Sequence, residues 1–415
     1  MDMLHPRCCA IDVHKKQVTV AVRLTESGRS TTQVRTFGTF TKDLLEMSDW
    51  LESMGITHVA MESTGCYWRP VYRVLEGRFE LVVANAQHVR NVPGRKTDVK
   101  DSEWLVQLLA HGLLSASFVP ESAQLALRDL TRGRTMFVRQ RATLANRIQK
   151  LLEECNIKLG SVASDVLGVS GRAMLEQLAQ GQSDPKSLAQ LALGKLKDKT
   201  AELEKALVGW VLPHQRILLG ELLRQVNSLD SCVARLESEI EQLIHEESRL
   251  PFESGVEIAQ TMPGIGLTSA RTIISEIGTD MDRFATSERL AAWSGAAPAN
   301  KQSAGKQLPG GKRHGNRHLL TCLVEWACSV IRMRHTYFYT LYRRIAARRG
   351  SRRALIAVAH AMLVALFHML KNGSKYEERG SNYLECQNKE RTITRLTRRL
   401  QELGCRVERS EVAQA

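Results

Sequence analysis

The sequence of 415 residues lacks any pair of cysteines at the spacing of a metal site. It has nine cysteines, scattered from Cys8 to Cys405, and none belongs to a CxxC motif. An odd number of cysteines without regular spacing argues against a disulfide framework or a zinc finger and favours a reduced compartment. The first residues, MDMLHPRCCAIDVH, also lack the apolar stretch of a signal peptide. We therefore expect a cytoplasmic protein.

Long apolar runs are equally scarce. The longest one extends from Ala354 to Leu370 and is interrupted by His360 and His368. It is slightly short for a membrane span, so it indicates a buried helix and no membrane association. Within such a helix we expect the two histidines to be core or groove residues rather than metal ligands.

Acidic residues are the scarcer charge, 44 against 58 basic ones, which leaves a net charge of +14. A charge of this size is typical of contact with a phosphate backbone, although a solvated surface would have the same composition. The excess is steepest between Lys312 and Arg353, where eleven basic residues accompany one acid, Glu325. A second group lies beside apolar positions and predicts a helix with either a phosphate-binding or a solvated face: Arg128, Arg132, Arg134, Arg139, Arg141 and Arg147.

The length predicts two or three folded units. Residues 1–120 follow the order three strands, helix, strand, helix, strand, helix. That is the order of an RNase H-like α/β domain. The pattern is helical after Pro120. We predict a helical linker and coiled-coil region over 121–250, a mainly α C-terminal domain over 251–375 and a helical tail over 376–415.

The coiled-coil prediction rests on apolar residues spaced alternately by three and four, which is a heptad seam. Its partner would be another helix of the same chain, such as the one with Leu203 and Leu207, or a second protomer. The seam consists of Leu219, Leu222, Val226, Leu229, Val233, Leu236, Ile240 and Leu243.

Four carboxylates have the placement of a metal site. Asp12 lies at the end of the first predicted strand, Glu62 ends the fourth, and Asp98 and Asp101 open a helix. A sheet of this order brings them to one edge, and crowded carboxylates repel unless cations neutralise them. Hard divalent ions such as Mg²⁺ take oxygen ligands, and a pair of them can clamp both oxygens of a phosphoryl transfer. Taken singly, each acid would be a helix cap or a surface residue.

Two segments after residue 260 predict contact with DNA. The turn MPGIG resembles a helix-hairpin-helix, in which the backbone N–H groups of Gly264 and Gly266 would meet phosphate oxygens, although a simple helix-joining turn has the same sequence. The following loop is rich in glycine and lysine and contains Ser303, a candidate nucleophile, whereas Ser294 is its competitor. The basic residues expected to bind nucleic acid here are Lys301, Lys306, Lys312, Arg313 and Arg317.

In this order, AIDVHK, MESTG, RKTDVKD, MPGIG and the segment from NKQSAGK to HGN resemble the DEDD transposases of the insertion-sequence-110 family, or bridge recombinases. The resemblance covers roughly residues 8–335. It implies a RuvC-like domain whose acids are Asp12, Glu62, Asp98 and Asp101, and a catalytic serine at Ser303.

The resemblance also implies strand exchange through a phosphoserine link, with Mg²⁺ at the acids. A structured guide RNA would pair with donor and target double-stranded DNA. The working form would be a homo-oligomer, a dimer or a tetramer. The sequence departs from the family at Ser102, where alanine is usual, and at Leu320, where a basic residue is common.

Two other functions use the same features. A junction-resolving nuclease of the RuvC type would use the four acids with water as nucleophile. A non-catalytic nucleic-acid binder would use only the hairpin and the basic helices. The coiled-coil region and the C-terminal domain weigh against a compact resolvase, and acids at strand ends weigh against a mere binder.

Overall fold

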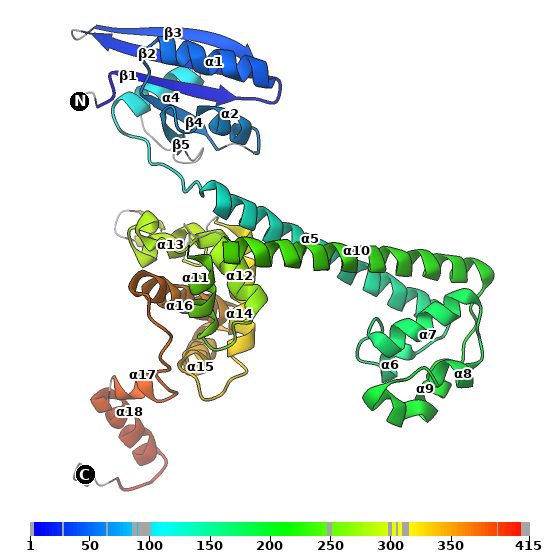
Figure 1. The fold of residues 1–415 in the computed structure, drawn as a ribbon. Coiled ribbons are helices and arrows are strands. Elements are labelled where there is room, and N and C mark those ends of the chain that lie inside the picture. The colour runs from blue at the N-terminus through cyan, green and yellow to red at the C-terminus, as the bar shows by residue number, and fades with distance from the viewer. Residues whose placement is uncertain are drawn as a thin grey trace. The chain divides into compact units, whose positions relative to one another are not determined.

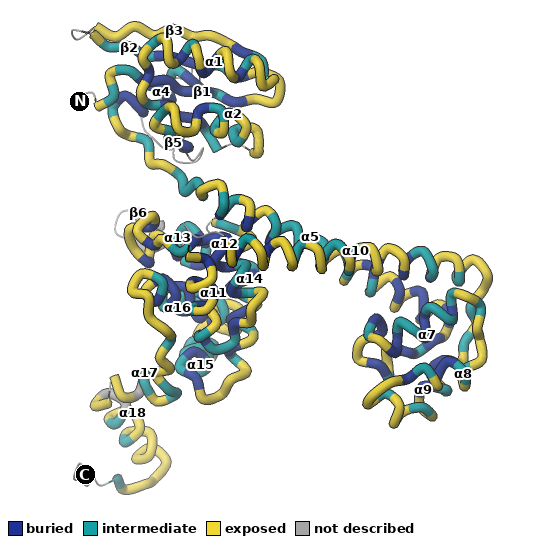
Figure 2. The backbone as a smooth tube through the Cα atoms, viewed as in Figure 1, coloured by how far each residue is buried: buried dark blue, intermediate teal, exposed yellow. Residues whose placement is uncertain are grey.

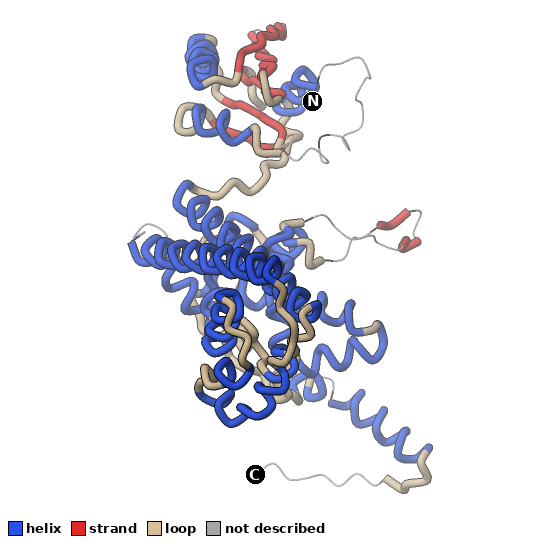
Figure 3. Tube along the Cα trace, turned by 90° about the vertical axis from the view of Figure 1, so that its right-hand side faces the viewer, coloured by secondary structure: helices blue, strands red, loops and turns tan. Residues whose placement is uncertain are grey.

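The computed structural model describes residues 4–26, 29–63, 65–84, 89, 101–246, 251–297, 301–303, 306–308, 315–387 and 389–407. These residues form two compact units, Met1–Pro120 and Glu121–Ala415 (Figure 1). The strands belong to the first unit and to one short hairpin in the second, and the rest of the second unit is helical (Figure 3).

The first unit is built on a mixed five-stranded sheet with the order β3-β2-β1-β4-β5. β1 pairs antiparallel with β2, and β2 with β3, whereas β1 and β4, and β4 and β5, are parallel. This confirms the predicted α/β domain and its RNase H-like strand order. The strands are β1 (Arg7–Val13), β2 (Gln17–Glu26), β3 (Arg29–Gly38), β4 (His58–Glu62) and β5 (Glu80–Ala84).

The two faces of this sheet differ in side-chain size, because successive strand residues point to opposite faces. Large residues such as Ile11 and Met61 pack against α1 (Thr41–Ser53) and α2 (Trp68–Leu75). The other face is lined by small residues, so α4 (Asp101–Ala110) lies close to the sheet. These small residues are Cys8, Ala10, Ala21, Ala60 and Ala84.

The second unit is helical apart from the hairpin of β6 (Lys301–Ser303) and β7 (Lys306–Leu308). Its α-helices are α5 (Ser122–Glu154), α6 (Leu159–Val162), α7 (Val169–Gln180), α8 (Pro185–Ala189), α9 (Thr200–Ala206), α10 (Pro213–Glu246), α11 (Phe252–Gln260), α12 (Leu267–Ile277), α13 (Ser287–Ser294), α14 (Arg317–Val330), α15 (Tyr337–Arg349), α16 (Ser351–Asn372), α17 (Tyr383–Cys386) and α18 (Lys389–Glu402). Among the described residues of this unit there are also two 3-10 helices, η1 (Gly194–Lys199) and η2 (Met281–Phe284).

The heptad seam lies on α10 and packs along α5 of the same chain, not along the helix that contains Leu203 (Figure 1). Leu219 and Val226 are buried at one end of the seam and Ile240 at the other. Between them Leu229 and Val233 are only half-buried. Polar contacts replace apolar ones in this middle stretch, where Arg134 and Arg141 of α5 pair with acids of α10.

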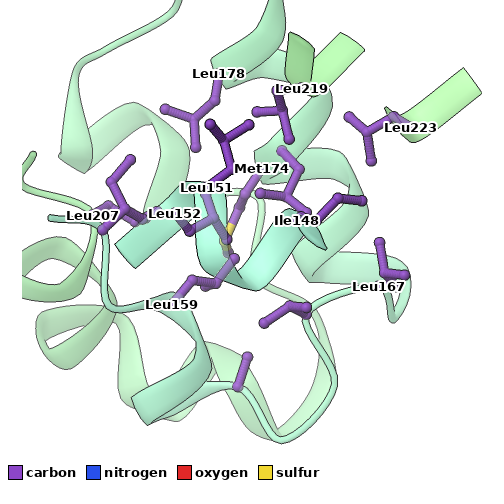
Figure 4. Close-up of a cluster of buried hydrophobic side chains, with 14 of the residues drawn as sticks. Ile148, Leu151, Leu152, Leu159, Leu167, Met174, Leu178, Leu207, Leu219 and Leu223 are labelled. Atoms are coloured by element: carbon purple, nitrogen blue, oxygen red, sulfur yellow. The ribbon is translucent and has the colours of Figure 1, made fainter. Parts of the chain in front are cut away.

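A hydrophobic core forms where the last part of α5 lies beside the first part of α10 (Figure 4). Ile148 and Leu152 of α5 meet Met174 and Leu178 of α7 and Leu219 of α10 there, and all five are buried. Figure 2 shows buried residues in this core and exposed residues along the outside of the paired helices α5 and α10. The core therefore anchors α10 against the chain's own helices.

The apolar run predicted as a buried helix is α16. This helix is long and apolar enough to cross a membrane, but it packs against α11, α13, α14 and α15. Val358, Met362 and Leu366 are fully buried in these contacts. His360 is partly buried, and this burial lowers its pKa, whereas nearby Glu288 acts in the opposite direction. α16 is thus a core helix of the second unit.

Candidate catalytic site and nucleic-acid surfaces

Three of the four predicted acids line one pocket. Ala10 of β1 and Ala60 of β4 face α4, and alternation places Asp12 and Glu62 on that same face. The parallel register pairs Ile11 with Met61, so Asp12 and Glu62 occupy the next step of the ladder. Asp101 begins α4, where the helix dipole favours a carboxylate. All three residues line a pocket of about 270 Å³.

The pocket has the donor chemistry of a hard cation site. Asp12 Oδ2 lies 3.1 Å from His14 Nε2, and 28% of the Asp12 side chain is exposed. Within the described part of the chain, no three acidic, histidine or cysteine side chains stand close enough to hold a metal ion. Asp98, the fourth predicted ligand, lies outside the described residues. The three carboxylates fit an oxygen-preferring divalent ion in type, and they line the pocket from β1, β4 and α4.

Ser303 ends strand β6 of the hairpin, opposite Lys306, and Lys301 lies opposite Leu308. Only the backbone of this hairpin is described. Lys312 and Arg313 lie outside the described residues, and Arg317 is exposed at the start of α14.

The competing serine, Ser294, has a structural role. It is fully buried at the end of α13, where its hydroxyl donates to the Ala291 carbonyl at 2.9 Å and accepts from the Ala296 N–H at 3.1 Å. A nucleophile needs a hydroxyl that reaches its substrate. The burial and bonding of Ser294 therefore weigh against it as the nucleophile.

The two residues that flank the segment carrying Ser303, Gly295 and Gly315, lie close together. A Cβ on Gly315 would lie only 2.3 Å from the Gly295 nitrogen, so the two backbones approach as closely as glycine allows. The Asn316 N–H donates to the Trp293 carbonyl at 3.0 Å. The Asn316 side chain caps α14 and donates to Glu276 at 2.5 Å.

Glu276 on α12 is the centre of a buried ionic network that was not predicted from the sequence. Its side chain is fully buried and receives two bonds from Arg132, at 2.6 and 2.8 Å, while Arg128 Nε lies 3.4 Å away. Burial alone would raise the pKa of Glu276, but the Arg132 hydrogen bond and the charges of both arginines outweigh it and lower the pKa. The sequence signal was one acid among buried isoleucines, IISEIG.

This network corrects the phosphate-binding prediction for most arginines of α5. Arg128 and Arg132 pair with Glu276, Arg134 pairs with Glu237 of α10, and Arg141 pairs with Asp230 of α10. These four cations join helices within the protein, because α12 and α10 present acids to them. Arg139 and Arg147 remain exposed.

The MPGIG turn joins α11 to α12 and has one packed and one open side. Gly264 has φ +81°, and a Cβ there would come within 3.1 Å of the Val330 nitrogen, so it serves the turn and its packing on α14. Gly266 has open space around it and caps α12. Thr268 and Ser269 in the first turn of α12 line a cleft of about 180 Å³, together with Arg139 of α5.

The remaining basic surface lies where α15 ends and α16 begins. Six arginines are exposed there, and in the part of the chain that the structure describes none of them pairs with an acid. These residues are Arg343, Arg344, Arg348, Arg349, Arg352 and Arg353.

A sheet of this order with acids at two strand ends and a helix start defines the class of RNase H-like DNA-processing enzymes, and comparison with known proteins narrows it. Residues 9–157 match a DEDD transposase family model described as "Transposase", and residues 256–343 match "Transposase IS116/IS110/IS902 family". The chain belongs to this family of DEDD transposases, which use a divalent metal.

The chain also resembles individual members. It is 26% identical over 295 residues to a probable family 20 transposase of Pseudomonas aeruginosa, which covers 69% of this chain and 75% of that protein. It is 30% identical over 150 residues to an uncharacterized 43.6 kDa protein of insertion element IS110 from Streptomyces coelicolor, over 35% of this chain and 34% of that protein. A 42 kDa protein of insertion element IS900 from Mycobacterium paratuberculosis is 26% identical over 171 residues, 40% of this chain and 41% of that protein.

Proposed function

We propose that this transposase cuts and rejoins DNA at the pocket of Asp12, Glu62 and Asp101, with Ser303 as the nucleophile. The convergence of the three acids on one pocket is the observation that carries the proposal. Together with Asp98 they would hold Mg²⁺. When bound, the ion would neutralise charge on the attacking and leaving oxygens of the phosphoryl transfer.

In the first step the Ser303 hydroxyl loses its proton and forms a bond to the scissile phosphorus. The bond from phosphorus to one sugar oxygen breaks, and that oxygen takes up a proton. The phosphoserine ester conserves the free energy of the broken phosphodiester bond. A DNA hydroxyl can therefore later attack the phosphorus of this ester, rejoin the strand and release the serine. Lys301 and Lys306 lie close in sequence to Ser303 and would stabilise the charge that develops on the phosphate oxygens.

Ser303 and the acids belong to different compact units. The complete site would therefore need residues from a first and a second unit, supplied by one protomer or by two. We propose a homo-oligomer, a dimer or a tetramer, that holds donor and target DNA. A structured guide RNA would select both sites by base pairing. The α5–α10 seam does not carry the oligomer proposal, because its buried positions are covered by the same chain.

The test is to denature reactions with end-labelled DNA and look for DNA attached to the protein. Ser303→Ala is expected to abolish the adduct and to lower recombination by roughly 10⁴-fold or more, while DNA binding remains. Asp12→Asn should also abolish activity, because one of the charges that bind the cation is lost.

Ser294→Ala is the matched control and should still form the adduct, provided that α13 stays folded. If Ser303→Ala keeps the adduct while Ser294→Ala loses it, the nucleophile is Ser294. If neither change matters and cleavage continues without an adduct, the protein is a nuclease that uses water.

A further inference from the structure

A second pocket, next to the acid pocket, has a different chemistry. It has a volume of about 270 Å³ and is lined by Arg23, Trp104, Gln107, Leu108, His111 and Leu113. None of these residues is acidic and one is a cation. The acid pocket, by contrast, has three carboxylates. The second pocket is therefore suited to a ligand that accepts hydrogen bonds or carries negative charge.

Three polar atoms on residues of this second pocket are buried without a hydrogen-bond partner in the described structure. They are Arg23 Nε, Trp104 Nε1 and His111 Nδ1. The indole N–H and the guanidinium Nε–H can only donate, and the imidazole nitrogen donates in one tautomer. Buried polar groups in native proteins nearly always have partners, so three such atoms around one pocket indicate a missing acceptor.

Arg23 reaches this pocket because of its place in the sheet. It pairs with Cys8 across β1 and β2, so its side chain lies on the α4 face. Its Nη2 donates to Ser30 Oγ at 3.1 Å, whereas its Nε is buried without a partner in the described structure. Its charge also opposes the rise in the Cys8 pKa, to about 11, that burial causes.

The two pockets follow one another along a single face of α4. Asp101, Trp104 and Leu108 of α4 and His111, which directly follows this helix, are spaced by three, four and three residues, which places them along one side of it. Trp104 lines both pockets. At the helical rise, the distance from Asp101 to His111, one residue past the end of α4, is about 15 Å, and this length spans about four nucleotides of duplex DNA.

We propose that the pocket of Arg23, Trp104 and His111 binds a backbone phosphate of the nucleic-acid strand whose scissile phosphate lies at the acid pocket. The phosphate oxygens accept from the three unpartnered nitrogens, and the Arg23 cation neutralises the phosphate charge. This rests on the acid pocket being the site of cutting but not on the role of Ser303. The shared chemistry is a phosphodiester, from DNA or from RNA.

The experiment measures binding of the full-length protein to duplex DNA, single-stranded DNA and single-stranded RNA over a range of salt concentrations. Arg23→Gln removes one cation that neutralises a phosphate, so it should reduce the log–log slope by about 0.9 for duplex or about 0.7 for a single strand. If the variant and the wild type bind duplex DNA equally well at 1 M salt, this change in slope makes the variant bind about eightfold more weakly at 0.1 M salt. The nucleic acid whose slope changes is the one bound in this pocket.

Arg35→Gln is the matched control, because it removes the same charge from the opposite face of the sheet. Arg35 pairs with Glu46 at 2.7 Å and stacks on Phe37, away from α4. The log–log salt slope of the Arg35→Gln variant should equal that of the wild type. Equal slopes for Arg23→Gln and the wild type with all three nucleic acids, or an equal loss in both variants, would overturn the proposal.

A second measurement needs only the folded wild type. The indole N–H resonance of Trp104, identified by its absence in Trp104→Phe, should shift when the nucleic acid selected by the salt experiment is added. An unchanged resonance at saturating nucleic acid would also reject the proposal. Because both measurements are of binding, they remain informative if Ser303 is not the nucleophile.

Discussion

At the scale of the residue, the buried Glu276 of α12 links this helix to α5 and to Asn316, which caps α14. It is fully buried and paired with Arg128 and Arg132. Replacing it by Gln leaves two arginines without their counter-charge, so Glu276→Gln should destabilise the second unit by roughly 3–5 kcal/mol at pH 7. Because the folded-state pKa of Glu276 is lowered from its ordinary value of 4.5, its stabilisation is complete above that value and is lost as pH falls through the folded pKa. The difference in unfolding free energy between variant and wild type should therefore narrow as the pH falls below 4.5, which urea unfolding at several pH values measures. A difference that widens on acidification contradicts this.

At the scale of the element, α10 is held mainly at its ends. Leu219 is 1% exposed, whereas Leu229 in the same seam is half-buried beside the ion pair of Arg141 and Asp230. Leu219→Ala should cost about 3 kcal/mol, and Leu229→Ala roughly a third of that, because the cost follows the apolar surface and cavity created. Urea unfolding of both variants gives the comparison, and sedimentation gives the oligomeric state. If Leu229→Ala cost as much as Leu219→Ala and also dissociated an oligomer, the seam would be an intermolecular coiled coil.

At the scale of the whole molecule, the excess of positive charge divides into two kinds of arginine. Those of α5 are mostly neutralised by acids of α10 and α12, whereas those at the turn from α15 to α16 are exposed and unpaired among the described residues. Changing Arg348, Arg349, Arg352 and Arg353 to Gln should reduce the salt slope of DNA binding by up to about 0.9 for each phosphate that is no longer neutralised. The pair Arg134→Gln and Arg141→Gln should instead lower the temperature of unfolding and leave the slope unchanged. The opposite pattern would assign the binding of phosphates to α5.

Periodicity and spacing in the sequence determined the strand order of the first unit, the positions of Asp12, Glu62 and Asp101, the seam on α10 and the buried helix α16. These features follow from local chemistry, because a period of two or of three to four residues decides which side chains a strand or helix buries. Only the tertiary structure decided that α10 pairs with α5, that Glu276 neutralises Arg128 and Arg132, and that Arg23 and His111 share a pocket with Trp104. In each case the partners are far apart in sequence, and which charges and helix faces meet depends on packing between elements. No local pattern records that packing.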